Sequence, residues 1–193
     1  GGGLYVPEEL PTLSLDEICA LARLPYAQRA AAIYKAFNVD LPDEAIDELM
    51  GRAYGDNFDD EAICPITSLD ESTHILELWH GPTSAFKDMA LQMLPQLLSA
   101  ALRKTGEKRT ACILVATSGD TGKAAMEGFA DVPQTRIQVY YPKNGVSAVQ
   151  EQQMVTQEGE NVDVRAVIGN FDDAQSGVKR IFSDEAIRAE LDR

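Results

Sequence analysis

The chain has 193 residues, of which 45% are hydrophobic and 25% charged, a balance typical of a globular protein that buries a core. Its 31 Asp and Glu residues outnumber 17 Lys and Arg residues, and the formal net charge of -14 disfavours nucleic acid and acidic membrane surfaces as partners. An anionic substrate would therefore need a locally positive pocket.

The cysteines and the apolar segments bear on the compartment. Cys19, Cys64 and Cys112 are odd in number, scattered and not at metal-ligand spacing, which argues against a disulfide scaffold and against a zinc site. No segment is apolar for long enough to span a bilayer, and the opening GGGLYVPEEL lacks the basic and apolar regions of a signal peptide. We expect a protein of the reducing cytoplasm.

The first third of the sequence predicts three helices. Residues 14–23 begin with a capping box of Ser14 and Glu17 and continue with apolar residues at helical spacing. Residues 26–37 are alanine-rich and follow a proline, and residues 43–55 carry acids in the first turn and end at a glycine.

The remaining sequence alternates between strand and helix patterns, so we predict a helical amino-terminal region, residues 1–73, and an α/β domain, residues 74–193. The expected strands are residues 75–79, 110–116, 136–142 and 161–169, and the expected helices are residues 83–106, 120–130, 147–157 and 172–191. Residues 110–116 are almost continuously apolar, as in a strand buried on both faces of a parallel sheet. The pattern predicts a doubly wound parallel sheet.

The helix that follows the Gly-Pro turn at residues 81–82 has recognisable boundaries. Thr83 and Ser84 are N-cap candidates, Pro95 is expected to kink the helix, and Gly106 is expected to end it. Lys87 falls in the first turn of this helix.

The position of Lys87 is unusual for a cation. The exposed N–H groups of a helix start disfavour an ammonium by a few tenths of a kcal/mol up to about 1 kcal/mol. Burial beside Phe86 would also favour the neutral amine, whereas the neighbouring Asp88 would offset part of this effect. A neutral lysine amine is a nucleophile that can form Schiff bases. On local grounds alone, a lysine that extends into solvent is the simpler interpretation.

A glycine-rich loop, ATSGDTGKAA at residues 116–125, lies between a predicted strand and a predicted helix. Backbone N–H groups and the helix dipole form an anion site at this place in α/β folds. A nucleotide P-loop needs glycine where Thr117 stands and serine or threonine where Ala124 stands, so that motif fails at two positions. A tight turn in which the glycines serve only geometry is the alternative.

Together these stretches resemble threonine synthase, a family of pyridoxal-phosphate enzymes of fold type II. The segments that carry the resemblance cover essentially the whole chain: GGGLYVPEELP, ELWHGPTSAFKDMALQ, ATSGDTG, YPKNGVSAVQEQQM and GNFDDAQ. Family enzymes are considerably longer, so we expect a fragment with low or no turnover and weak cofactor retention by itself.

The resemblance implies a role for each candidate residue. Lys87 would form the Schiff base with pyridoxal 5'-phosphate and then move protons as acid and base, with Phe86 and Asp120 beside the cofactor. Loop residues would grip the α-carboxylate of the substrate: Thr117, Ser118, Gly119, Thr121 and Gly122. Lys143, Ser147 and Gln150 are candidates for the substrate phosphate.

The implied reaction converts O-phospho-L-homoserine and water to L-threonine and phosphate. A threonine-synthase-like phospho-lyase, a catalytically silent binding module of the same fold and a P-loop hydrolase are the alternatives. His80 could approach the cofactor or cap a strand, and His74 is most simply a surface residue. Neither histidine predicts a metal site, and the sequence does not indicate an oligomeric state.

Overall fold

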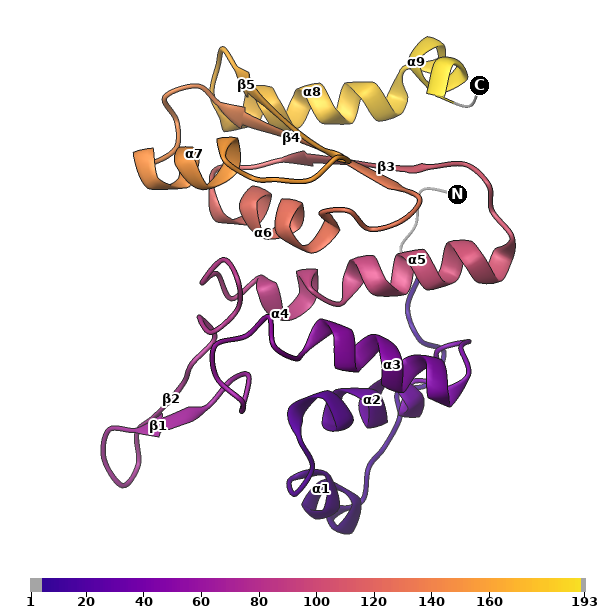
Figure 1. Ribbon diagram of the computed structural model, residues 1–193, viewed down its shortest axis with the longest axis vertical. Coiled ribbons are helices and arrows are strands. Elements are labelled where there is room, and N and C mark those ends of the chain that lie inside the picture. Colours follow the sequence, from indigo (N-terminus) through magenta and orange to yellow (C-terminus); the bar gives the residue numbers. More distant parts are fainter. Residues whose placement is uncertain (1–4, 192–193) are drawn as a thin grey trace.

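The computed structural model of the chain describes residues 5–191, and Figure 1 shows its layers. The amino-terminal helices lie at one end, a long broken helix crosses the middle, and a parallel sheet with its own helices lies at the other end. This is the predicted architecture, a helical region followed by a doubly wound parallel sheet.

The amino-terminal layer has three helices, α1 (Leu15–Leu21), α2 (Tyr26–Ala36) and α3 (Asp43–Ala53). The predicted capping box at the start of α1 is confirmed. The Glu17 carboxylate accepts a hydrogen bond from the Ser14 N–H at 2.7 Å, and the Ser14 hydroxyl accepts one from the Glu17 N–H at 3.3 Å.

The middle helix is divided into α4 (Asp88–Leu91) and α5 (Leu94–Thr105). Pro95 lies in the first turn of α5, where its missing N–H costs nothing, so the predicted kink is a break between two helices. The predicted end is confirmed, because Gly106 caps α5 with a left-handed φ of 69°. The N-cap prediction was wrong: Lys87 occupies that position in α4.

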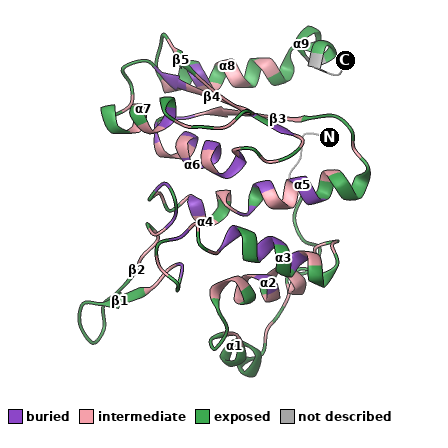
Figure 2. Ribbon diagram, in the orientation of Figure 1, coloured by how far each residue is buried: buried purple, intermediate pink, exposed green. Residues whose placement is uncertain are grey.

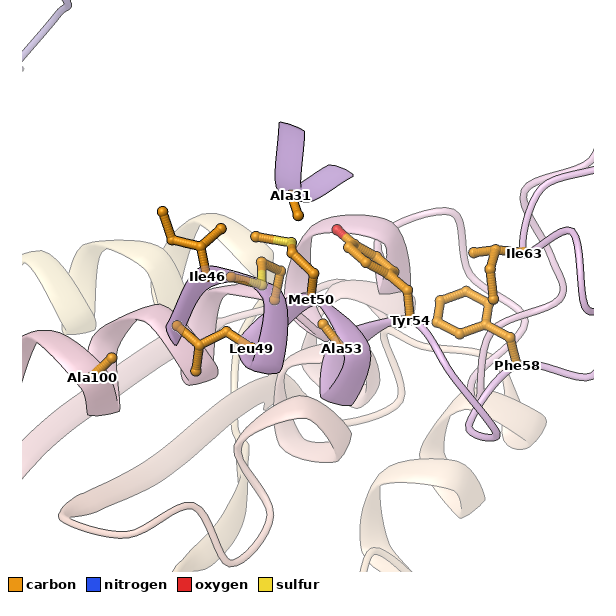
Figure 3. Packing of buried hydrophobic residues seen from close by; sticks show 10 residues of the cluster. Ala31, Ile46, Leu49, Met50, Ala53, Tyr54, Phe58, Ile63 and Ala100 are labelled. Carbon is orange, nitrogen blue, oxygen red and sulfur yellow. The ribbon is translucent and has the colours of Figure 1, made fainter. Parts of the chain in front are cut away.

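A first hydrophobic core joins the amino-terminal layer to the middle helices (Figure 3). Met50 of α3 is fully buried, and the hydroxyl of Tyr54 donates a hydrogen bond to the Met89 carbonyl of α4 at 2.6 Å. The buried members of this core are Ala31, Ile46, Leu49, Met50, Ala53, Tyr54, Phe58, Ile63, Met93 and Ala100.

The parallel sheet has the order β3 (Ala111–Ala116), β4 (Thr135–Pro142) and β5 (Val162–Val167). Helices α6 (Asp120–Phe129) and α7 (Ala148–Val155) cover one face of it (Figure 1). A second core lies between these two helices and the sheet. Its buried residues are Ala125, Met126, Phe129, Ile137, Val139, Tyr141 and Met154.

The opposite face of the sheet carries α8 (Phe171–Ser183), followed by α9 (Glu185–Leu191) (Figure 1). A single helix was expected here, but Asp184 takes an extended backbone conformation and separates the two. Figure 2 shows how burial varies over the fold. Cys112 of β3 is exposed, so the prediction that this strand is buried on both faces was wrong. Among the residues described, none of the helices is both long and apolar enough to cross a membrane.

Of the strand predicted at residues 75–79, only residues 75 and 76 form a strand, and they belong to a separate hairpin. Strands β1 (Ile66–Ser68) and β2 (His74–Leu76) pair antiparallel and project away from the parallel sheet (Figure 1). Its assignment to the alternating strand and helix pattern was therefore wrong. The proposed domain boundary at residue 73 falls in this hairpin turn and stays a prediction.

Candidate functional site

Lys87 reaches across from the start of α4 to the start of α6. Its Nζ lies 3.0 Å from Oδ2 of Asp120 and 4.3 Å from the centroid of the Phe86 ring. The Lys87 side chain is 27% exposed, so it is partly shielded but open to solvent. Three predicted cofactor contacts thus meet at one point. The sequence did not indicate the contact with Asp120.

The turn that leads to Lys87 is folded around the carboxylate of Asp88. Oδ2 of Asp88 accepts a hydrogen bond from the Thr83 N–H at 2.9 Å, and Oδ1 accepts one from the Thr83 hydroxyl at 2.7 Å. Ser84 takes a φ of 58°, which costs a residue other than glycine about 1–3 kcal/mol. Strain of this kind persists where surrounding contacts fix the backbone.

The glycine loop follows β3 and is organised by Thr117. This residue is buried, and its hydroxyl oxygen accepts hydrogen bonds from the N–H groups of Gly119 at 3.1 Å and Gly122 at 2.9 Å. Gly119 takes a φ of 150°, a conformation that suits glycine. The Thr117 side chain is enclosed and already bonded, so it shapes the loop, and its contact with the substrate stays a prediction.

Asp120 begins α6, and its two carboxylate oxygens have different partners. Oδ1 accepts a hydrogen bond from the Thr121 N–H at 2.9 Å, which leaves Oδ2 directed at Lys87. Ser118 is exposed at the tip of the loop. Of the predicted loop contacts, Ser118 is therefore the most accessible to a ligand. The N–H groups of Gly119, Thr121 and Gly122 already donate hydrogen bonds within the loop.

The segment after β4 lies at the same edge of the sheet, since the carboxyl ends of parallel strands meet there. Lys143 is exposed. Ser147 caps α7 in a capping box with Gln150, so its hydroxyl has a structural use. The Gln150 side chain lies against the loop, because a Cβ atom on Gly119 would come within 2.4 Å of Gln150 Nε2.

Both histidines have local structural partners. His80 lies between two carboxylates, with Nδ1 2.6 Å from Asp59 and Nε2 2.8 Å from Glu77. The hydrogen bond to Glu77, followed by that to Asp59, raises the pKa of His80 above its usual value. His74 is exposed, as expected, and its Nδ1 lies 2.8 Å from the Ser68 hydroxyl.

Comparison with known proteins identifies the family. Residues 1–54 match the family described as "Threonine synthase N terminus". Threonine synthase of Pseudomonas aeruginosa is 43% identical over 95% of this chain and 39% of its own length. The crystal structure of PLP-bound threonine synthase from Brucella melitensis superposes with a TM-score of 0.91 at 38% identity, over 99% of this chain and 41% of that chain. The chain belongs to the threonine synthase family.

Another relative carries a related but different name. Human "Threonine synthase-like 1" is 37% identical over 95% of this chain and 25% of its own length. The chain thus spans about two fifths of the threonine synthases of Pseudomonas and Brucella and a quarter of this human protein.

Two features of this chain could not be read from its sequence. Asp88 is completely buried, although its position suggested only a charge beside Lys87. Lys123 was a residue without an assigned role, and it points inward to Glu127 at 2.9 Å and to the Gln157 side chain. The burial of Asp88 depends on how α4 packs against α6, and the Lys123 contact with Gln157 depends on how α6 packs against α7. Within residues 5–191, His, Cys, Asp and Glu side chains form no group that could hold a metal ion.

Proposed function

We propose that Lys87 binds pyridoxal phosphate covalently in the protein that carries this chain, and that this protein converts O-phospho-L-homoserine and water to L-threonine and phosphate. The 3.0 Å contact between Lys87 Nζ and Asp120 carries the proposal, because it joins the lysine segment to the glycine loop. The PLP-bound state of the Brucella relative supports the choice of cofactor.

The residues around Lys87 fit this cofactor. A phosphorylated aldehyde needs an accessible primary amine, and anionic substrate groups need polar contacts at the carboxyl edge of the sheet. Lys87 offers a partly exposed amine, and exposed Ser118 and Lys143 follow two neighbouring strands at that edge. When bound, pyridoxal phosphate supplies an electron sink that stabilises carbanions of the substrate.

Each residue then has a defined task. Lys87 Nζ attaches the cofactor and, once released, takes and returns protons at the substrate. Asp120 Oδ2 accepts a hydrogen bond from this amine and holds it above the glycine loop. The Phe86 ring lies against the amine but is 59% exposed, so the predicted burial of Lys87 beside Phe86 is wrong. Ser118 and Lys143 would bind the anionic groups of the substrate.

The visible spectrum with pyridoxal phosphate, before and after Lys87→Ala, tests the proposal. The unsubstituted protein should show a Schiff-base band and a borohydride-trapped adduct on Lys87. Lys87→Ala should lose both and lower turnover by roughly 100-fold or more, because the amine also moves protons. Lys179→Ala, which changes an exposed lysine of α8, is the matched control. An adduct that persists in Lys87→Ala would contradict the proposal.

A second candidate is a phospho-lyase that releases phosphate and a keto acid from a related substrate. We keep it because a relative at comparable identity, human "Threonine synthase-like 1" at 37%, carries a name other than threonine synthase. Product analysis separates the two, since only the synthase forms threonine with each phosphate. We expect residues 1–193 by themselves to turn over weakly or not at all, and robust threonine formation by them would refute that expectation.

A further inference from the structure

Asp88 is a buried acid with no part in the function proposed above. Its exposed fraction is 0%, although Phe86, two residues before it, is exposed. A carboxylate in such a place is costly unless hydrogen bonds replace its lost water. The two bonds from the main chain and the hydroxyl of Thr83, at 2.9 and 2.7 Å, supply that replacement.

The same carboxylate is in close contact with the start of the turn. A Cβ atom on Gly81 would lie 2.6 Å from Asp88 Oδ2, so only glycine lets the backbone approach this closely. The Thr83 hydroxyl also lies 3.4 Å from the Ala85 N–H, which donates to it. The turn from Gly81 to Ala85 is therefore wrapped around a single side chain.

These contacts restrict Lys87 from both sides. The segment of residues 84–87 is short, Thr83 before it is tied to Asp88, and Asp88 itself is the first residue of α4. Ser84 keeps its positive φ of 58° only while this span is held. The contacts between Thr83 and Asp88, which we call the anchor, thus fix the backbone of Lys87. They also fix the direction in which Nζ leaves the turn.

Helix α6 supplies the electrostatic surroundings of Asp88. Burial raises the pKa of its carboxyl group above the usual value, the two Thr83 bonds lower it, and Glu127 and Lys123 contribute opposite smaller effects. Lys123 is only 15% exposed and pairs with Glu127 at 2.9 Å. Helix α6 therefore places Asp120 near Lys87. Further along the same helix it places Lys123 and Glu127 near Asp88.

We propose that Asp88 is a positioning residue: through Thr83 it fixes the turn at residues 81–85 and so aims Lys87 Nζ at Asp120 and at the cofactor. The inference rests on the proposed function of Lys87. In this proposal Asp88 acts on Lys87 through the backbone and does not contact substrate or cofactor.

Substitutions at Thr83 and Asp88 test the anchor. Thr83→Val keeps the shape of the side chain but removes the hydroxyl donor, Thr83→Ser restores it, and Asp88→Asn removes one acceptor. We expect Thr83→Val and Asp88→Asn to slow borohydride trapping on Lys87 by roughly 10- to 100-fold, because a misplacement of about 1 Å has this effect on a reaction. Thr83→Ser should trap at the unsubstituted rate. Asp70→Asn changes an exposed turn aspartate that also accepts main-chain bonds, and it is the matched control.

A second measurement needs no cofactor. Hydrogen exchange at the Thr83 amide should be slow in the unsubstituted protein and fast in Asp88→Asn, since this amide donates to Asp88. If Asp88→Asn does not fold, Thr83→Val and Thr83→Ser carry the test.

The outcomes separate the anchor from the proposed function. Unchanged trapping in a folded Thr83→Val variant overturns the anchor alone, as does slow trapping that Thr83→Ser fails to restore. The absence of any adduct on Lys87 in the unsubstituted protein overturns the proposed function itself, and the positioning role with it.

Discussion

His80 stands between Glu77 and Asp59, with Asp60 also near enough to raise its pKa. Because the folded-state pKa lies above the unfolded value of about 6.5, the contribution of His80 to stability is fully present below that value. It is lost as the pH rises through the folded-state pKa. Denaturant unfolding of the protein and of His80→Gln across this range should give a stability difference that shrinks as the pH rises.

His74→Gln is the control for this pH dependence. His74 lies on the exposed hairpin, and its ring contacts the Ser68 hydroxyl, so its replacement should alter stability little at any pH tested. If the difference between the protein and His80→Gln is the same at every pH, the two carboxylates do not hold His80 in its charged form.

At the scale of elements, the approach of α4 to α6 sets the geometry of the site. A Cβ atom on Gly128 would lie 2.0 Å from the Leu91 carbonyl oxygen, so Gly128→Ala must push the two helices apart. We expect a loss of about 1–3 kcal/mol in unfolding free energy, the usual range for overpacking. Denaturant titration measures it.

Gly51→Ala is the matched control for Gly128→Ala. Gly51 is an exposed glycine inside α3, and a Cβ atom there would meet no heavy atom within 4 Å. This change should stabilise the protein by about 0.5–1 kcal/mol, because alanine loses less conformational freedom than glycine in a helix. Equal effects of the two substitutions would show that helix propensity, rather than the contact with Leu91, determines the response at Gly128.

In this fold the sequence predicts features that depend on residues close together in the chain, and it does not predict features that depend on packing between elements. The Ser14 capping box and the left-handed Gly106 were readable because each involves neighbours within a few residues. The hairpin β1–β2 was missed because its strands have three residues each and no alternation to detect. The family resemblance placed Lys87 and Asp120 beside the cofactor. Their direct contact at 3.0 Å and the burial of Asp88 depend on packing across helices, which sequence spacing does not encode.

At the scale of the whole molecule, α5 links the two hydrophobic cores. Leu97 packs against the core of α2 and α3, and its neighbour Leu98 packs against the core of the sheet. Two adjacent residues of α5 therefore pack against two different hydrophobic cores. A helix shared in this way couples the layers, so we expect one cooperative unfolding transition.

Met50→Ala tests this coupling because Met50 is fully buried in the first core, far in sequence from the sheet. The cavity should lower the free energy of unfolding by about 2–5 kcal/mol. If the molecule unfolds as a unit, hydrogen exchange at the Val139 amide of β4 should accelerate as much as exchange at the Leu49 amide of α3. Val149→Ala, at an exposed position of α7, is the control and should change neither. Faster exchange confined to α2 and α3 would mean that the amino-terminal layer opens independently of the sheet, and that α5 does not couple the two cores.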